Sequence, residues 1–77
     1  MKTIEILGPG CANCEKLEQM VRQIVDEKGI QAEVVKISDF KDIAKRGVLS
    51  TPGLVIDGEV KCTGRVPEKD ELENWIS

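Results

Sequence analysis

Hydrophobic and polar residues repeat with two different periods along the chain, and these periods predict its elements. Residues 2–7 form a short β-rich run that stops at the breaker cluster of residues 8–10, which predicts a strand followed by a loop. Apolar residues then recur every three or four positions up to Gly29, which predicts an amphipathic helix. These apolar residues are Cys14, Leu17, Met20, Val21, Ile24 and Val25.

The middle of the chain predicts a second strand and a short helix. Residues 32–37 carry the β-rich composition of a strand. Ser38 and Asp39 offer an N-cap, and Gly47 offers a stop, so a short helix is expected between them. The side chains expected to turn inward from this helix are Phe40, Ile43 and Ala44.

The last third predicts a hairpin and a final helix. Residues 54–56 and 60–63 are separated by Asp57-Gly58, a dipeptide that tolerates the positive φ angles of a two-residue turn, so the two runs are expected to pair antiparallel. Pro67 suits the first position of a helix, and the acidic residues after it complement the helix dipole. These are Glu68, Asp70 and Glu71, and the inward-facing residues are Leu72, Trp75 and Ile76.

The predicted order of elements is β-α-β-α-β-β-α. Two strands that flank a long helix predict a right-handed parallel crossover, and the hairpin is expected to extend the same sheet. We therefore predict an α/β fold with a four-stranded mixed sheet and three helices packed on its faces. Residues 1–77 are expected to form a single domain, because neither a repeat nor a linker divides them.

Composition narrows the classes of function. With 77 residues, 40% apolar and 32% charged, the chain has the composition of a small soluble globular protein. A net charge of −3 and two aromatic residues give neither a basic field for phosphates nor a row of stacking platforms, so no nucleic-acid partner is expected. Without a signal-peptide apolar region or a membrane span, we expect a cytoplasmic protein with no membrane partner. We also expect a monomer.

The candidate chemistry lies in Cys11-Ala12-Asn13-Cys14, at the junction of the first predicted strand and helix. The unpaired N–H groups and the dipole of a helix N-terminus favour an anion, and in such settings the pKa of a cysteine falls from about 8.5 toward 7 or below. Cys11 is expected to project from the leading edge and attack, while Cys14 lies on the apolar face and resolves. A purely structural disulfide is disfavoured in a reducing compartment. Closing so small a loop would also stabilise the folded protein by only about 2 kcal/mol.

Metal binding is the alternative function. The small heavy-metal-associated domains also place a C-x-x-C after their first strand and carry soft metals such as Cu(I), which two thiolates suit. Those domains usually have a methionine where this chain has Pro9, and their elements follow the order βαββαβ. Three cysteines and no histidine do not complete a tetrahedral zinc site in one chain. We therefore expect neither a resident metal nor a cofactor.

The chain resembles the thioredoxin superfamily, in a small form that lacks the extra N-terminal strand and helix of full thioredoxins. A C-x-x-C near a βαβ unit is typical of that superfamily, and the resemblance covers nearly the whole chain. It is carried by residues 11–14, 35–39, 47–52, 57–60 and Gly64. The resemblance implies a thioredoxin-like fold and a thiol–disulfide oxidoreductase that acts on protein disulfides and is recycled by an unidentified reductase.

The resemblance also implies roles for residues outside the cysteine pair. The family proline that matches Pro52 is cis and stands beside the disulfide, which leaves the backbone of Thr51 free to pair with an extended substrate. Glu5 stands where thioredoxins carry a buried acid; if buried, its pKa would be raised, and it could pass a proton to Cys14. Lys36 matches a strand lysine that can pair with that acid. For Glu5 a solvated position at a face or edge of the sheet is an equal alternative, and for Lys36 a solvated position on the strand is the favoured interpretation.

Some positions depart from the family pattern. Gly10 replaces the aromatic residue before the first cysteine, and the Ala12-Asn13 pair differs from those of thioredoxins and glutaredoxins, so a reduction potential does not transfer. Residues 62–66 lack the double glycine and aspartate that help glutaredoxins to hold glutathione. Cys62 alternates with Val60 on the second hairpin strand, so we expect it to be buried as a small hydrophobe; a third exchanging thiol is the alternative.

Overall fold

The computed structural model describes residues 1–77 and contains the predicted elements in the predicted order. One mixed sheet has the strand order β2-β1-β3-β4, with β1 parallel to β2 and the other pairs antiparallel. The strands are β1 (Lys2–Leu7), β2 (Ala32–Ile37), β3 (Gly53–Ile56) and β4 (Glu59–Thr63). The helices are α1 (Ala12–Lys28), α2 (Phe40–Lys45) and α3 (Lys69–Ile76). The predicted α/β fold is confirmed.

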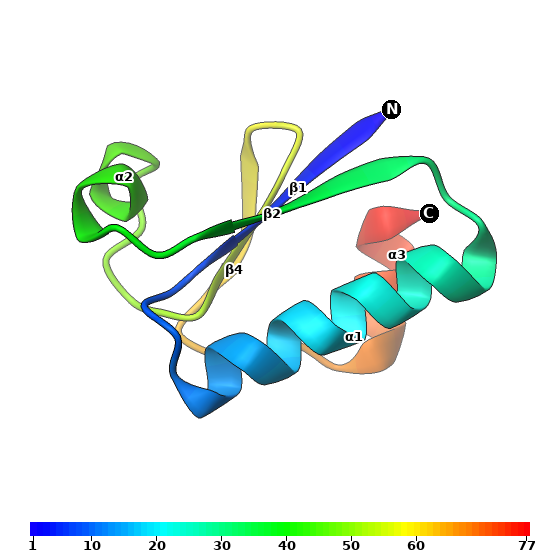
Figure 1. Cartoon of the computed structure of the whole chain (residues 1–77), viewed down its shortest axis with the longest axis horizontal. Coiled ribbons are helices and arrows are strands. Elements are labelled where there is room, and N and C mark those ends of the chain that lie inside the picture. The colour runs from blue at the N-terminus through cyan, green and yellow to red at the C-terminus, as the bar shows by residue number, and fades with distance from the viewer.

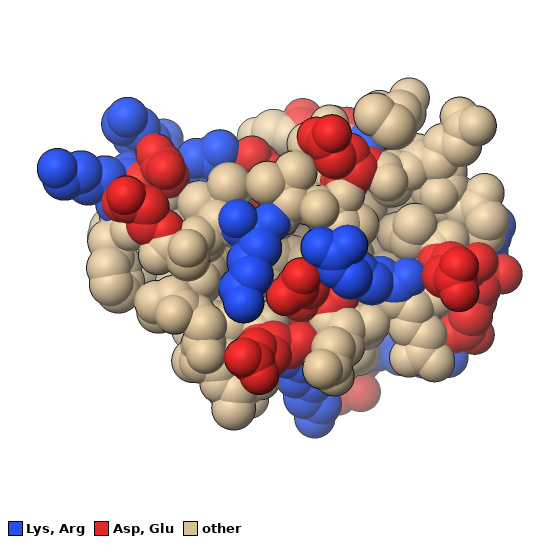
Figure 2. Space-filling view, in the orientation of Figure 1, with Lys and Arg blue, Asp and Glu red and all other residues tan.

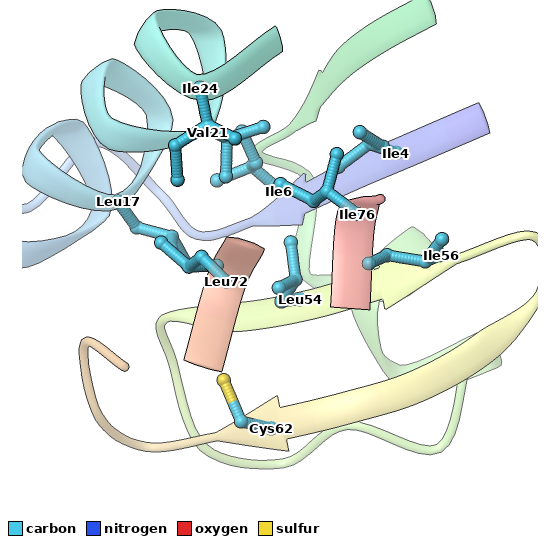
Figure 3. Close-up of a cluster of buried hydrophobic side chains, with 10 residues drawn as sticks. All are labelled: Ile4, Ile6, Leu17, Val21, Ile24, Leu54, Ile56, Cys62, Leu72 and Ile76. Atoms are coloured by element: carbon cyan, nitrogen blue, oxygen red, sulfur yellow. The ribbon is translucent and has the colours of Figure 1, made fainter. Parts of the chain in front are cut away.

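The helices cover both faces of the sheet, with α1 and α3 on one face and α2 at the other (Figure 1). Because side chains of a strand alternate between faces, the central strands β1 and β3 contribute to two cores. The larger core lies between these strands and α1 and α3 (Figure 3), and it contains Ile4, Ile6, Leu17, Val21, Ile24, Leu54, Ile56, Cys62, Leu72 and Ile76. The smaller core contains Leu7, Ile43, Val48 and Val55.

Helix α2 buries fewer side chains than expected. Asp39 caps it, since its carboxylate accepts the N–H of Lys41 at 2.8 Å. Ile43 is buried as predicted, but Phe40 is 68% exposed and Ala44 is also exposed. The prediction for Phe40 and Ala44 is wrong because a helix of six residues makes fewer than two turns, so a single position points squarely at the sheet.

Helix α3 begins later than the sequence predicts. Pro67 is buried but lies ahead of the helix, so its predicted place at the first helical position is wrong. The start is fixed instead by a capping box, in which Glu68 is the N-cap and the Glu71 carboxylate accepts the Glu68 N–H at 3.0 Å. Arg65 also donates two hydrogen bonds to this carboxylate, and these bonds lower the pKa of Glu71 to about 2.

The hairpin forms as predicted but contains an irregularity. Asp57 and Gly58 have φ angles of 51° and 82°, as a two-residue turn requires. Cys62 pairs with Leu54 and Val60 pairs with Val55, with a register shift between them. The expected alternation is therefore wrong: Cys62 joins the larger core, whereas Val60 lies on the other face and is 41% exposed.

The two ends of the chain meet at one end of the molecule (Figure 1). The Lys2 ammonium donates to the backbone carbonyls of Ile76 and Ser77 at the end of α3, a position where a cation is favoured by the helix dipole. Acidic and basic side chains are interspersed on the face that Figure 2 shows. Among the ion pairs of the surface, the Arg22 guanidinium lies 3.0 Å from the Glu18 carboxylate, one helical turn away. None of the helices is long and apolar enough to cross a membrane.

Candidate active site

Cys11 and Cys14 form a disulfide at the N-terminus of α1. Their Cα atoms are 5.1 Å apart, within the range that a disulfide spans. After β1 the chain turns at Gly10, whose φ of 99° favours glycine, and Cys11 then serves as the N-cap of α1. This turn explains why a glycine stands directly before the cysteine pair.

The two cysteines have different surroundings. Cys11 is exposed, whereas Cys14 has no exposed surface. The N–H of Cys14 donates to the Cys11 sulfur at 3.2 Å, which places that sulfur where the free N–H groups and the dipole of α1 stabilise negative charge. An incoming sulfur atom can therefore reach Cys11 from solvent but cannot reach Cys14.

The loop before β3 lies beside this pair. A methyl group on Gly8 would lie 2.9 Å from the Cβ of Cys14 and 3.8 Å from the Cβ of Thr51, so Thr51 and the disulfide both lie next to Gly8. The Thr51–Pro52 peptide bond is cis, and the carbonyl of Pro52 accepts the N–H of Gly64 at 2.9 Å. The backbone N–H and C=O of half-exposed Thr51 form no hydrogen bond within the chain. These groups are free to pair with another polypeptide.

Glu5 does not have the surroundings that the predicted proton transfer needs. It shares a face of β1 with Leu7, on the side of α2, and its carboxylate accepts two hydrogen bonds from Arg46 at 2.8 and 2.9 Å. These bonds lower the pKa of Glu5 below its ordinary value, although partial burial acts in the opposite direction. The raised pKa on which the predicted role depends is therefore not found.

Lys36 is exposed, as the favoured interpretation predicts, and its partner is not Glu5. In the parallel pairing of β1 with β2, Lys36 is opposite Ile6 while Glu5 is opposite Val35. Adjacent positions of a strand face opposite sides of the sheet, so Lys36 points toward α1, where its ammonium lies 3.7 Å from the Glu18 carboxylate. The pairing of Lys36 with Glu5 that the resemblance implies is therefore not found.

The Glu5–Arg46 pair leads to a stability prediction. Because the pKa of Glu5 is lowered in the folded state, its stabilising effect is complete above the ordinary value of 4.5 and is lost as the pH falls through the folded pKa. Glu5→Gln is expected to lower the free energy of unfolding by about 1 kcal/mol at pH 7 and by nearly nothing in strong acid. Urea unfolding between pH 7 and 2 measures this difference.

The matched control for this prediction is Glu33→Gln. Glu33 is an exposed residue of β2 that forms no ion pair, so this change is expected to leave the free energy of unfolding nearly unchanged at every pH. A destabilisation by Glu5→Gln that stayed the same down to pH 2 would contradict an electrostatic origin.

Cys62 lies in the larger core and takes no part in the disulfide. Its sulfur is 3.9 Å from the backbone carbonyl of Arg65 and points toward α3 (Figure 3). Burial raises the pKa of the Cys62 thiol above its ordinary value, even though Arg65 acts in the opposite direction. The predicted burial is confirmed, and a buried thiol with a raised pKa is a poor nucleophile.

The observed order of elements also separates this chain from the heavy-metal-associated domains. A helix, α2, occupies residues Phe40–Lys45, where the order βαββαβ requires a strand. No group of three or more His, Cys, Asp or Glu side chains is arranged to hold a metal ion.

Comparison with known proteins identifies the family. A family model described as "Thioredoxin domain" matches residues 2–77. The chain belongs to the thioredoxin family. A protein named Thioredoxin from Methanothermobacter thermautotrophicus is 46% identical over 77 residues, which is 100% of both chains. Another Thioredoxin, from Methanocaldococcus jannaschii, is 37% identical over 76 residues, 99% of this chain and 87% of that protein.

A more distant relative belongs to the same group. The protein named Probable Thioredoxin from Archaeoglobus fulgidus is 31% identical over 72 residues, 90% of this chain and 78% of its own length. As a member of the thioredoxin family, the chain is a thiol–disulfide oxidoreductase, and the Cys11–Cys14 disulfide is the pair suited to that chemistry.

Proposed function

We propose that this thioredoxin family member reduces disulfides of protein substrates, with Cys11 as the nucleophile and Cys14 as the resolving thiol. The observation that carries the proposal is the asymmetry of the pair. Cys11 is an exposed residue whose sulfur accepts a hydrogen bond from an N–H at the start of α1, while its partner Cys14 is buried. A thiolate is the reactive form of a cysteine, and the start of a helix favours it.

The reaction proceeds in two exchanges. The Cys11 thiolate attacks one sulfur of the substrate disulfide, whose S–S bond breaks, and the departing sulfur takes up a proton. Cys14 then loses its proton and attacks the Cys11 sulfur, which releases the substrate as a dithiol and closes the Cys11–Cys14 disulfide. Two electrons pass from the protein to the substrate, and a reductase that donates electrons from its own dithiol or an equivalent centre restores the pair.

Thr51 and Pro52 are proposed to bind the substrate backbone. The unpaired N–H and C=O of Thr51 lie beside the disulfide and can form strand-like hydrogen bonds with an extended polypeptide. Buried Pro52, tied to Gly64 through its carbonyl, holds the loop in place. This mode of binding reads the backbone of the substrate, so it suits protein disulfides in unfolded or extended segments.

Reduction of insulin by dithiothreitol tests the proposed function. The wild-type protein is expected to accelerate the reduction well above the uncatalysed rate, and Cys62→Ala, which removes the thiol outside the pair, is expected to keep this activity. No acceleration by the wild-type protein would overturn the proposal. Retention of Cu(I) by that inactive protein would favour the metal carrier instead.

A further inference from the structure

Gly8 is in contact with the buried sulfur of the pair, and its backbone does not explain why it is glycine. Unlike Gly10, it does not have a φ angle in the left-handed region. Its N–H donates to the carbonyl of Ile37 at 2.8 Å, which continues the pairing of β1 with β2. An alanine could adopt this backbone conformation, so the requirement for glycine must come from the space around it.

That space is filled by Cys14. A methyl group on Gly8 would overlap the Cys14 sulfur and lie 2.9 Å from the Cys14 Cβ, well inside the separation of about 3.5–4.0 Å that nonbonded carbon atoms prefer. Gly8 and Cys14 are both buried, so a shift of either backbone to relieve the overlap would displace packed neighbours. The backbone of Gly8 therefore forms the wall against which the Cys14 sulfur rests.

The disulfide and dithiol forms differ in how strictly the Cys14 sulfur must lie against Gly8. In the disulfide form the bond to Cys11 fixes the Cys14 sulfur in the position that a methyl group on Gly8 would occupy. In the dithiol form the sulfur is no longer held by that bond and can turn to another staggered rotamer. The close approach to the Cys14 Cβ is common to both forms, but only the disulfide form also holds the sulfur in the overlap. Added bulk at Gly8 should therefore raise the free energy of the disulfide form more than that of the dithiol form.

We propose that Gly8 is a positioning residue that sets the balance between the disulfide and dithiol forms, by leaving room for the Cys14 sulfur where the disulfide needs it. The inference rests on the proposed redox role of the pair. In the equilibrium concerned, a dithiol such as dithiothreitol transfers two electrons and two protons to the protein disulfide, giving the protein dithiol and oxidised dithiothreitol.

The test is this equilibrium, measured in Gly8→Ala by alkylating the free thiols in dithiothreitol buffers of graded composition. The equilibrium constant is expected to move toward the dithiol form by about tenfold or more, which corresponds to a reduction potential about 30 mV less negative. An equilibrium constant equal to that of the wild-type protein would overturn the proposal.

Gly53→Ala provides the matched control. Gly53 is buried and also outside the left-handed region, but a methyl group there would lie 3.0 Å from Val48 and 3.4 Å from Leu7 and would not meet a cysteine. This variant is expected to lose stability without any change in the redox equilibrium. A shift as large as that of Gly8→Ala would overturn the proposal, because general crowding of the core would then explain both.

A second measurement separates positioning from a general loss of stability. In denaturant, Gly8→Ala is expected to lose more unfolding free energy in the oxidised form than in the reduced form, whereas equal losses would contradict the proposal. If Gly8→Ala does not fold, the same change in a Cys14→Gly background, where both the sulfur and the Cβ are absent, is expected to fold, and failure of that double variant would also contradict it.

The redox equilibrium and the unfolding free energies are measured without a protein substrate, so they test the role of Gly8 separately from the proposed function. If the wild-type protein reduces insulin but Gly8→Ala leaves the redox equilibrium unchanged, only the role of Gly8 is refuted. If Gly8→Ala shifts the redox equilibrium but the wild-type protein does not reduce insulin, only the proposed function is refuted.

Discussion

Cys11→Ser is expected to lower the rate of insulin reduction by about a thousandfold or more. A serine hydroxyl does not ionise near neutral pH and cannot form the mixed disulfide through which the exchange passes. Cys14→Ser is expected to behave differently, because its Cys11 still attacks but no second thiol releases the substrate. The covalent complex of protein and substrate should therefore accumulate and be visible by mass spectrometry without reductant.

The two variants control each other, since each removes one sulfur from the same disulfide. The exposed position of Cys11 and the burial of Cys14 predict that only Cys14→Ser traps the complex. Trapping by Cys11→Ser instead would reverse the two roles, and trapping by neither would contradict a mechanism that passes through a mixed disulfide.

Leu54→Ala is expected to lower the free energy of unfolding by about 3 kcal/mol, the cost of lost burial plus a cavity. Leu54 has no exposed surface and lies in β3 between β1 and β4, within the larger core (Figure 3). Small proteins have only about 5–15 kcal/mol of total stability, so this one change removes a large part of it. In a domain of this size the melting temperature should fall by about 12–24 °C.

Leu49→Ala is the matched control, because it makes the same chemical change at a leucine that is 93% exposed. It is expected to alter the free energy of unfolding by no more than about 0.5 kcal/mol. Thermal unfolding followed by circular dichroism compares the two variants. Equal losses from both would contradict the assignment of Leu54 to the core.

The sequence predicted those parts of the fold that depend on local patterns. The period of apolar residues located α1, and Gly29 ends it as expected, with a φ of 60°. Asp57-Gly58 predicted the hairpin because its turn needs positive φ angles, which few dipeptides tolerate. The position of the cysteine pair at the start of α1 was also predictable from local signals, because the strand, the breaker residues and the helix follow one another directly in the chain.

The wrong predictions concern features that neighbouring residues do not determine. Phe40 is apolar, but the direction of its side chain depends on how the short α2 lies on the sheet. Val60 and Cys62 are two positions apart, yet the register shift in the hairpin sends them to opposite faces. Likewise, Glu5 is held by Arg46, a residue 41 positions away along the chain, and no sequence period reports such a contact.

Gly8 shows the same limit within the candidate site. Its place among residues 8–10 explains it adequately as part of a loop, so the sequence offers no reason to single it out. Only the folded chain brings its backbone against the Cys14 sulfur.

The contact of Lys2 with the last carbonyls of α3 has a practical consequence. It gathers the amino and carboxyl ends together, while β1, about 20 Å long for six residues, carries the chain from there toward the disulfide. An affinity tag, a fluorophore or a fused partner attached at either end would therefore sit far from Cys11. Immobilisation through such a tag should leave the reactive sulfur facing the solution.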